Sequence, residues 1–241
     1  MGYSANNEVA KKLFTSIPES FDTEVERLPK ISVKVTKLGD SIPSINLPPI
    51  VTCRADAPCA KCTEEGGGCY ALRGHWMYKG PRNGLWNNLY AYRQNPKRFF
   101  ESIATQTALF KFVRWFSAGD IVDMEFLKGM VRVARKNTGT KYLCFTKKYE
   151  LVNEYLNAGG RIPSNLKIVF STWGDLIPEN PHNLPLTYVK FALRGNKAKK
   201  AEIMALNAKI PESAIPCTGK CYACQACWSL KKGQAVAFNK H

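Results

Sequence analysis

The sequence predicts an α/β fold with parallel strands and a cysteine-rich segment at its C-terminal end. Short apolar runs alternate with stretches of helical period through the middle of the chain. These runs are nearly continuous, which is typical of strands buried on both faces of a parallel sheet. The chain has 241 residues, 45% of them hydrophobic, which is enough for one sizeable core. We therefore expect one sheet with right-handed helical crossovers.

The first part of the chain is a polar lead-in. Its alternating stretch ISVKVTK predicts a strand over 31–37. The proline-rich stretch 41–53 favours an extended segment. The following segment, 53–74, contains four cysteines and the triplet GGG, a composition typical of a loop.

Helices and strands then alternate along the chain. Pro96 suits the first turn of a helix, Asp123 suits an N-cap, and the glycine pair at 159–160 suits a helix end. The predicted helices cover 83–95, 96–109, 123–137 and 147–160. The predicted strands cover 110–117, 141–146, 166–172 and 186–194.

A basic helical stretch over 194–210 follows the last predicted strand, and four further cysteines follow that stretch. The sequence therefore divides into a lead-in at 1–45, an α/β core with the first cysteine loop at 46–205, and a metal-binding appendage at 206–241.

Candidate site residues follow the ends of three predicted strands. In parallel sheets, ligands bind beyond the carboxyl ends of the strands. The candidates there are Ser117, Gly119, Asp120, Thr146 and Thr172. The hydroxyl residues could instead form turns at the strand ends, and Asp120 could form a local turn ahead of the next helix.

The charge balance is strongly basic, with 35 Lys+Arg against 19 Asp+Glu and a formal net charge of +16. A polyanionic partner fits this balance, nucleic acid first, and so does a basic protein with scattered lysines. The best phosphate-binding candidates are Lys197, Lys199 and Lys200, because little apolar sequence around them needs burial.

The first residues, MGYSANNEVAKKLF, lack the apolar region of a secretory signal, and no stretch is apolar and long enough to span a membrane. We therefore expect a cytoplasmic protein, of a bacterium or a phage-infected cell, without membrane contact. In that compartment clustered cysteines indicate metal binding rather than disulfides.

Eight of the nine cysteines fall into two sets. The N-terminal cysteine set consists of Cys53, Cys59, Cys62 and Cys69, and the C-terminal cysteine set consists of Cys217, Cys221, Cys224 and Cys227. The second set has the spacing C-x3-C-x2-C-x2-C, close to the compact runs that wrap a [4Fe–4S] cluster. Zinc sites usually separate two C-x2-C pairs by a dozen or more residues, so we favour iron–sulfur and keep zinc as the alternative.

The N-terminal set is wider, with the spacing C-x5-C-x2-C-x6-C. Three of its thiols could hold a cluster and leave one iron open to a small molecule, whereas four could hold a structural zinc. The ninth cysteine, Cys144, lies within an apolar strand and is expected to be a buried core thiol.

Several stretches resemble the phage "gene product 88" family, over about residues 45–241. They are CYA at 69–71, RWFSAGD at 114–120, FTKKYELV at 145–152 and the closing AVAFNKH, together with the C-terminal cysteines. The order of cysteine loop, helix, strand and small-Gly-acid turn in turn resembles the radical S-adenosylmethionine superfamily.

That second resemblance implies a partial (β/α) barrel with one or two [4Fe–4S] clusters and bound S-adenosylmethionine. It implies that Asp120 receives the methionine ammonium, that Gly119 allows its close approach, and that the hydroxyls of Ser117, Thr146 and Thr172 line the pocket floor. An electron donor would then be a partner.

We accordingly expect an iron–sulfur protein, a divergent radical-SAM-like enzyme that cleaves S-adenosylmethionine reductively and acts on an unknown substrate. The alternative is a zinc-stabilised nucleic-acid-binding protein without catalysis. An iron–sulfur redox sensor is a third interpretation.

Overall fold

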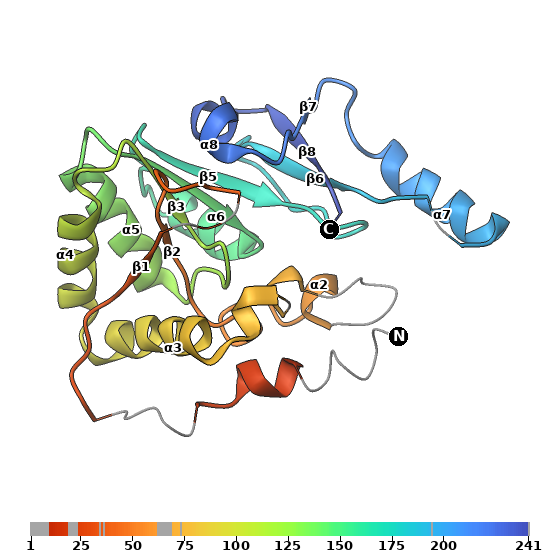
Figure 1. The fold of residues 1–241 in the computed structure, drawn as a ribbon. Coiled ribbons are helices and arrows are strands. Elements are labelled where there is room, and N and C mark those ends of the chain that lie inside the picture. The colour runs from red at the N-terminus through yellow and green to blue at the C-terminus, as the bar shows by residue number, and fades with distance from the viewer. Residues whose placement is uncertain are drawn as a thin grey trace.

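An open, mostly parallel sheet of eight strands forms the centre of the protein (Figure 1). The structure is a computed structural model and describes residues 10–18, 24–33, 35, 37–61, 69–72, 74–193 and 195–240. The strand order is β1-β2-β3-β4-β5-β6-β8-β7, and every neighbouring pair is parallel except β1 with β2. Because β1 and β7 lie at opposite ends of this order, the sheet is not closed. The predicted α/β fold with parallel strands is confirmed, and a barrel is not.

The strands match the predicted core strands closely. Their bounds are β1 (Ile31–Ser32), β2 (Ser44–Ile45), β3 (Phe112–Trp115), β4 (Lys141–Thr146), β5 (Leu166–Ser171), β6 (Leu186–Lys190), β7 (Ile215–Pro216) and β8 (Ala235–Asn239). Among the described residues of the strand predicted over 31–37, Ile31 and Ser32 form β1, and Val35 instead forms an isolated antiparallel bridge with Gly39. Strand β2 lies in the proline-rich stretch that was predicted to be merely extended.

The helices begin and end close to the predicted boundaries. Their bounds are α2 (Pro58–Lys61), α3 (Lys79–Gln94), α4 (Pro96–Thr107), α5 (Met124–Lys136), α6 (Tyr149–Asn157), α7 (Lys197–Ala208) and α8 (Cys221–Cys224), with 3-10 turns η1 (Tyr70–Leu72), η2 (Gly74–Met77) and η3 (Ala226–Ser229). Pro96 occupies the first turn of α4. The Asp123 carboxylate accepts a hydrogen bond from the Phe126 N–H, so this residue caps α5 as predicted.

Helices α3 to α6 cover one face of the sheet, here called the outer face (Figure 1). Side chains alternate along a strand, so Val113 and Trp115 of β3 point to this face. They pack into the main hydrophobic core with Phe100 of α4 and Phe126 of α5. Burial of these aromatic rings supplies much of the apolar stabilisation of the fold.

The opposite face, here called the inner face, is covered by the C-terminal segment. Phe112 of β3 and Leu143 of β4 pack there against Trp228 and Leu230. The Trp228 indole N–H also donates to the Val113 carbonyl oxygen, at 3.0 Å. The C-terminal segment is therefore built into the sheet through β7 and β8, and it is not an appendage. Sequence periodicity missed both strands because they are short and flank the cysteines.

Among the described residues, none of the helices combines the length and the apolar character that crossing a bilayer requires.

Candidate metal centres

The C-terminal cysteine set lines one small cavity on the inner face. Strand β7, the turn after it, α8, η3 and Val236 of β8 form the cavity wall, and all four thiols of the set line it. The Gly219 N–H points toward Cys217 Sγ at 3.4 Å, an N–H to sulfur contact that would stabilise a thiolate. The backbone takes left-handed conformations at Gly219 (φ 75°) and Gln225 (φ 53°), which bend the chain around the cavity.

Burial and the charges of two basic residues, Arg114 and Lys37, shift the pKa values of thiols in this set in opposite directions. Burial raises the pKa of Cys227 to about 12, the neighbouring Cys221 and Cys217 add to the rise, and the charge of Arg114 opposes it. Burial likewise raises the pKa of Cys221, and Arg114 and Lys37 oppose that rise. Without a metal, burial therefore favours the neutral thiols of Cys221 and Cys227, and a bound cation would favour their thiolate forms.

Four cysteine thiols are the donors that both a structural zinc ion and a [4Fe–4S] cluster take. The cysteines that the structure describes are free thiols. In the same part of the chain, no group of three or more His, Cys, Asp or Glu side chains is placed to hold a single metal ion. A tetrahedral zinc site needs sulfur atoms roughly 3.8 Å apart, given its Zn–S bonds of about 2.3 Å. All four cysteines of the set line one cavity, and four cysteines are also the ligands that a [4Fe–4S] cluster takes.

The volume of the cavity favours a single ion over a cluster. Its volume is about 20 Å³, which is room for roughly one water molecule or one ion. A cluster would therefore require the wall to open outward, and Cys224, at the end of α8, is the exposed cysteine of the set.

Three thiols of the N-terminal set lie near the carboxyl ends of β2 and β3. Cys53 follows Thr52, whose hydroxyl oxygen accepts a hydrogen bond from the Asp120 N–H at 3.1 Å. Burial, then the negative charge of Asp120, raises the pKa of the Cys53 thiol, and Cys69 and Cys59 contribute further. These four side chains thus share one region of the molecule. Cys62, the remaining member of the set, lies outside the described residues.

Asp120 is buried and links the ends of three segments. Its carboxylate accepts hydrogen bonds from the Thr146 hydroxyl (2.6 Å), from the Lys147 N–H (2.9 Å) and from its own neighbour, the Ile121 N–H (2.8 Å). Burial raises the pKa of Asp120, and the hydrogen bonds from Thr146, Lys147 and Ile121 oppose the rise. The N-cap of α5 is Asp123, and Asp120 does not cap this helix. The hydrogen bonds of Asp120 instead tie the end of β3 to the end of β4.

Gly119 allows the chain after β3 to approach the segment after β2. Its φ of 84° is in the left-handed region, and a Cβ atom here would lie 2.6 Å from the Leu47 carbonyl oxygen. The Leu47 N–H also donates to the Ala118 carbonyl oxygen. The structure therefore accounts for this glycine by backbone packing.

The other predicted site residues divide between two places. The Ser117 hydroxyl is buried beside Asp120 and has no hydrogen-bond partner among the described residues. Tyr70, which follows Cys69, donates its hydroxyl hydrogen to the Ser117 carbonyl oxygen. The Thr172 hydroxyl instead donates to the Thr187 carbonyl oxygen at 2.8 Å, so it ties β5 to β6. Only Ser117, Gly119, Asp120 and Thr146 therefore gather near the N-terminal set.

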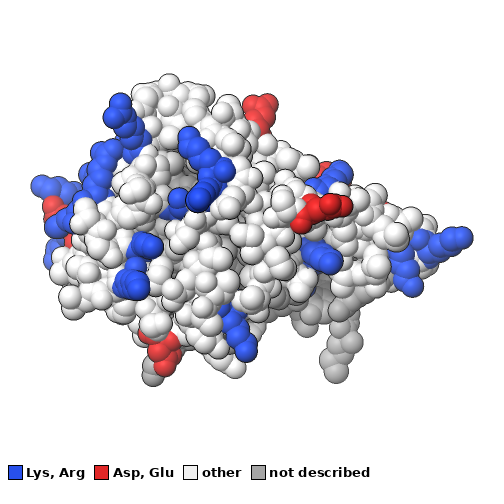
Figure 2. All heavy atoms as spheres, turned by 90° about the horizontal axis from the view of Figure 1, so that it is seen from above, with Lys and Arg blue, Asp and Glu red and all other residues white. Residues whose placement is uncertain are grey.

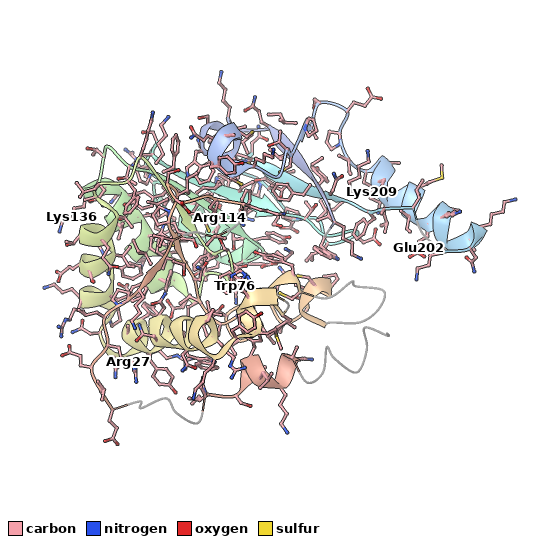
Figure 3. The ribbon with its side chains drawn as sticks, viewed as in Figure 1. Arg27, Trp76, Arg114, Lys136, Glu202 and Lys209 are labelled. Carbon is pink, nitrogen blue, oxygen red and sulfur yellow. The ribbon has the colours of Figure 1, made fainter. Side chains whose placement is uncertain are left out.

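The lysines proposed for phosphate contact lie on α7. This helix has no buried residue, and it projects from the side of the molecule, where Figure 3 labels Glu202 and Lys209. Lys197, Lys199 and Lys200 are exposed in its first turns. In Figure 2, Lys and Arg side chains gather at this tip and over the opposite half of the face, with few acidic groups among them.

Sequence reasoning missed three residues that shape these sites. The Asn46 side-chain oxygen accepts hydrogen bonds from the backbone of Ser117 (2.7 Å) and Ala118 (3.2 Å), and so holds the end of β3. The Lys37 carbonyl oxygen accepts a hydrogen bond from the Cys221 N–H, and the charge of Arg114 lowers the pKa of Cys221 and Cys227. Arg114 gave the one available signal, because it is a cation inside the apolar run FVRWF.

The comparisons with known proteins identify one family. The family model described as gene product 88 matches residues 23–233. No curated protein and no solved structure matches the chain. Since the match spans most of the sequence, the chain belongs to the gene product 88 family.

Proposed function

We propose that the protein binds an iron–sulfur cluster through Cys217, Cys221, Cys224 and Cys227. The observation that carries the proposal is that these four cysteines, the ligand set that a [4Fe–4S] cluster takes, line one cavity. When bound there, a [4Fe–4S] cluster would supply one-electron chemistry. The protein would provide the four thiolates, an apolar wall that includes Trp228, and the nearby charge of Arg114.

Anaerobic purification with analysis of iron, acid-labile sulfide and zinc tests this proposal. We expect roughly equal amounts of iron and sulfide, and an absorbance near 400 nm that Cys224→Ser weakens. Cys144→Ser is the matched control, because this thiol is fully buried in the main core, far along the chain from either set. Zinc at one equivalent without sulfide would refute the cluster.

We further propose that the N-terminal set holds a second centre, which makes the protein a divergent radical-SAM-like enzyme. Two features support this proposal: strands β2 to β6 are neighbours in chain order, and Thr52 and Cys53, which follow β2, lie beside Asp120. Because the Asp120 carboxylate is occupied by protein donors, its role would be to position the loop and the strand end. The enzyme proposal predicts 5′-deoxyadenosine release when the reduced protein meets S-adenosylmethionine.

Zinc-stabilised nucleic-acid binding is the second candidate, favoured by the ion-sized cavity and by the exposed lysines of α7. Three lysines in the first turns of a helix oppose its dipole, a local cost that a phosphate-binding role would explain. This candidate predicts salt-dependent retention of single-stranded DNA or RNA. Replacement of Lys197, Lys199 and Lys200 by Gln would abolish the retention, and replacement of Lys79, Lys97 and Lys128 would not.

A further inference from the structure

Four side chains form an unbroken row of contacts beyond the carboxyl ends of β4, β5, β6 and β8, which are neighbours in the sheet. Lys147 directly follows β4, Trp173 lies two residues after β5, and Phe191 and Lys240 directly follow β6 and β8. The Trp173 and Phe191 rings meet edge to face, with 5.9 Å between their centroids. The Lys147 Nζ atom lies 5.6 Å from the centre of the Trp173 ring, and Lys240 Nζ lies 5.1 Å from that of Phe191. These four residues are here called the cation–aromatic row.

The two lysines of the row end two similar stretches of sequence, FTK at 145–147 and FNK at 238–240. Residues two apart in a strand point to the same face, so each lysine follows its phenylalanine on the inner face. The Phe145 and Phe238 rings contact each other, with 5.4 Å between their centroids, and both pack against the inner-face core. Strands β5 and β6 separate β4 from β8 in the sheet. The inner face is therefore concave here, and both lysines lie at its rim.

Core packing does not account for the two rings of the row. Trp173 and Phe191 are half-buried, and neither belongs to a hydrophobic cluster formed by the described residues. A lysine ammonium keeps its hydration, so a ring face that carries one borders on water. Aromatic faces beyond the carboxyl ends of parallel strands, where ligands bind, indicate a binding surface.

The surroundings of the row leave its positive charge available. The Lys147 ammonium donates to the Ser171 hydroxyl oxygen at 3.1 Å, which is a neutral acceptor. Two acidic residues follow members of the row in the sequence, Glu150 and Asp175, and each forms an ion pair with a basic residue. The row therefore suits an anionic ligand.

Helix α7 adjoins the row. The Asn207 side chain is hydrogen-bonded to the backbone N–H and the carbonyl oxygen of Phe191, at 2.8 and 2.9 Å. From there the helix extends away from the sheet, on the side where the C-terminus lies (Figure 1). Its exposed lysines, Lys197, Lys199 and Lys200, therefore continue the basic surface that starts at the row.

We propose that the cation–aromatic row is a contact surface for single-stranded nucleic acid. Bases stack on the Trp173 and Phe191 rings, and phosphates contact Lys147 and Lys240. Interleaved rings and cations bind single strands without sequence preference, because every base has a π-face and every nucleotide carries a phosphate. The inference rests on the nucleic-acid candidate of the proposed function. It gives that candidate base contacts, which the lysines of α7 do not supply.

Tryptophan fluorescence tests the stacking, because Trp173 is half-buried whereas the other four of the five tryptophans are buried. The probe is a single-stranded thymidine oligomer of about 12 nucleotides. We expect it to quench the emission of the wild type. Trp173→Phe should lose this quenching and keep an affinity within about threefold of the wild type, because a ring remains for stacking. Trp173→Leu should bind about tenfold more weakly. Tyr78→Leu is the control, because Tyr78 is an exposed aromatic residue outside the row, and its affinity should be unchanged.

The salt dependence of binding tests the phosphate contacts. On a single strand, each phosphate contact contributes roughly −0.7 to the slope of log K against the logarithm of the salt concentration. Lys147→Gln and Lys240→Gln should each make this slope shallower by about that amount. Lys128→Gln is the matched control, because Lys128 is exposed on α5, and its slope should equal that of the wild type. Circular dichroism establishes that each variant is folded. If Trp173→Leu is not, Trp173→Phe and the two lysine variants carry the test.

The outcomes separate this inference from the function on which it rests. Loss of quenching in Trp173→Phe, together with shallower slopes in both lysine variants, supports the inference. A wild-type protein that does not bind the oligomer would refute both the inference and the nucleic-acid candidate. Binding with quenching that persists in Trp173→Phe, or with unchanged slopes in Lys147→Gln and Lys240→Gln, would overturn the inference and leave the lysines of α7 as the nucleic-acid site. AMP that binds as tightly as the oligomer would identify a mononucleotide site and overturn the assignment to a single strand.

Discussion

The Thr146 hydroxyl donates a 2.6 Å hydrogen bond to the carboxylate of Asp120, and both groups are buried. The two residues follow the apolar parts of adjacent parallel strands, so this hydrogen bond fixes β3 and β4 at the edge of the sheet where Thr52 and Cys53 lie. The same carboxylate holds the backbone of Lys147. A residue that resembles a ligand-binding acid in the sequence is therefore used by the fold itself.

Asp120→Ala should destabilise the protein by about 2–4 kcal/mol, because it leaves the Thr146 hydroxyl and two backbone N–H groups buried without an acceptor. Urea unfolding followed by circular dichroism measures this loss. Asp175→Ala is the control, because this aspartate is exposed and pairs only with Lys209 among the interactions described. Equal stabilities of the two variants would contradict the assigned role.

The pKa of Asp120 predicts a pH dependence. Burial raises this pKa above its ordinary value of 3.8, so the folded protein binds the proton more tightly than the unfolded chain does. As the pH falls from 7 through the folded-state pKa, the wild type should gain stability relative to Asp120→Asn. The gain should be complete below 3.8, where both states are protonated. Unfolding free energies of both proteins, measured between pH 7 and pH 5, test the sign. A loss of stability of the wild type relative to Asp120→Asn on acidification would count against it.

Gly119→Ala should cost about 2–4 kcal/mol, since it combines a left-handed backbone with a clash against the Leu47 backbone. Gly84→Ala provides the contrast. Gly84 lies within α3, and a Cβ atom there would meet nothing within 4 Å. It should therefore stabilise the protein by about 0.5–1 kcal/mol through helix propensity. Thermal unfolding of both variants gives the comparison, and two changes of the same sign would reject the packing argument.

Sequence pattern was a good guide to the core and a poor guide to its edges. The strands around Val113, Cys144 and Val169 are apolar runs flanked by clear helix signals, so local sequence determines them. Strands β2 and β8 form only because neighbouring strands offer hydrogen-bonding edges, which no local pattern encodes. The sequence singles out Asp120 and Gly119 as candidate ligand-binding residues, but burial and backbone contacts decide their place in the fold, and these depend on residues far away in the sequence.

Thiol reactivity should separate the cysteines in the metal-free protein. Cys224 is exposed, whereas Cys144 is fully buried and burial raises its pKa well above the ordinary value. Iodoacetamide at pH 8 should modify Cys224 first, and Cys144 on the order of 100-fold more slowly, after opening of the core. Mass spectrometry of peptides follows each site. Loading of the metal centre should protect Cys224 and leave the rate at Cys144 limited by unfolding. Rapid labelling of Cys144 in the folded protein would disprove its burial.

Trp228 should couple metal binding to the stability of the sheet. Its buried ring packs on Phe112 and its indole N–H is bonded to β3, so Trp228→Phe loses a hydrogen bond and leaves a cavity at a cost of about 1.5–3 kcal/mol. Trp173→Phe, at a half-buried position beside Phe191, should cost less than about 1 kcal/mol.

Metal removal by a chelator should lower the melting temperature of the wild type, because only the folded chain presents the four thiols together. Since Trp228 directly follows Cys227, its loss should also loosen the wall of the cavity. The melting temperature of Trp228→Phe should then respond less to the chelator than that of Trp173→Phe, and an equal response would show that the cavity forms without this contact.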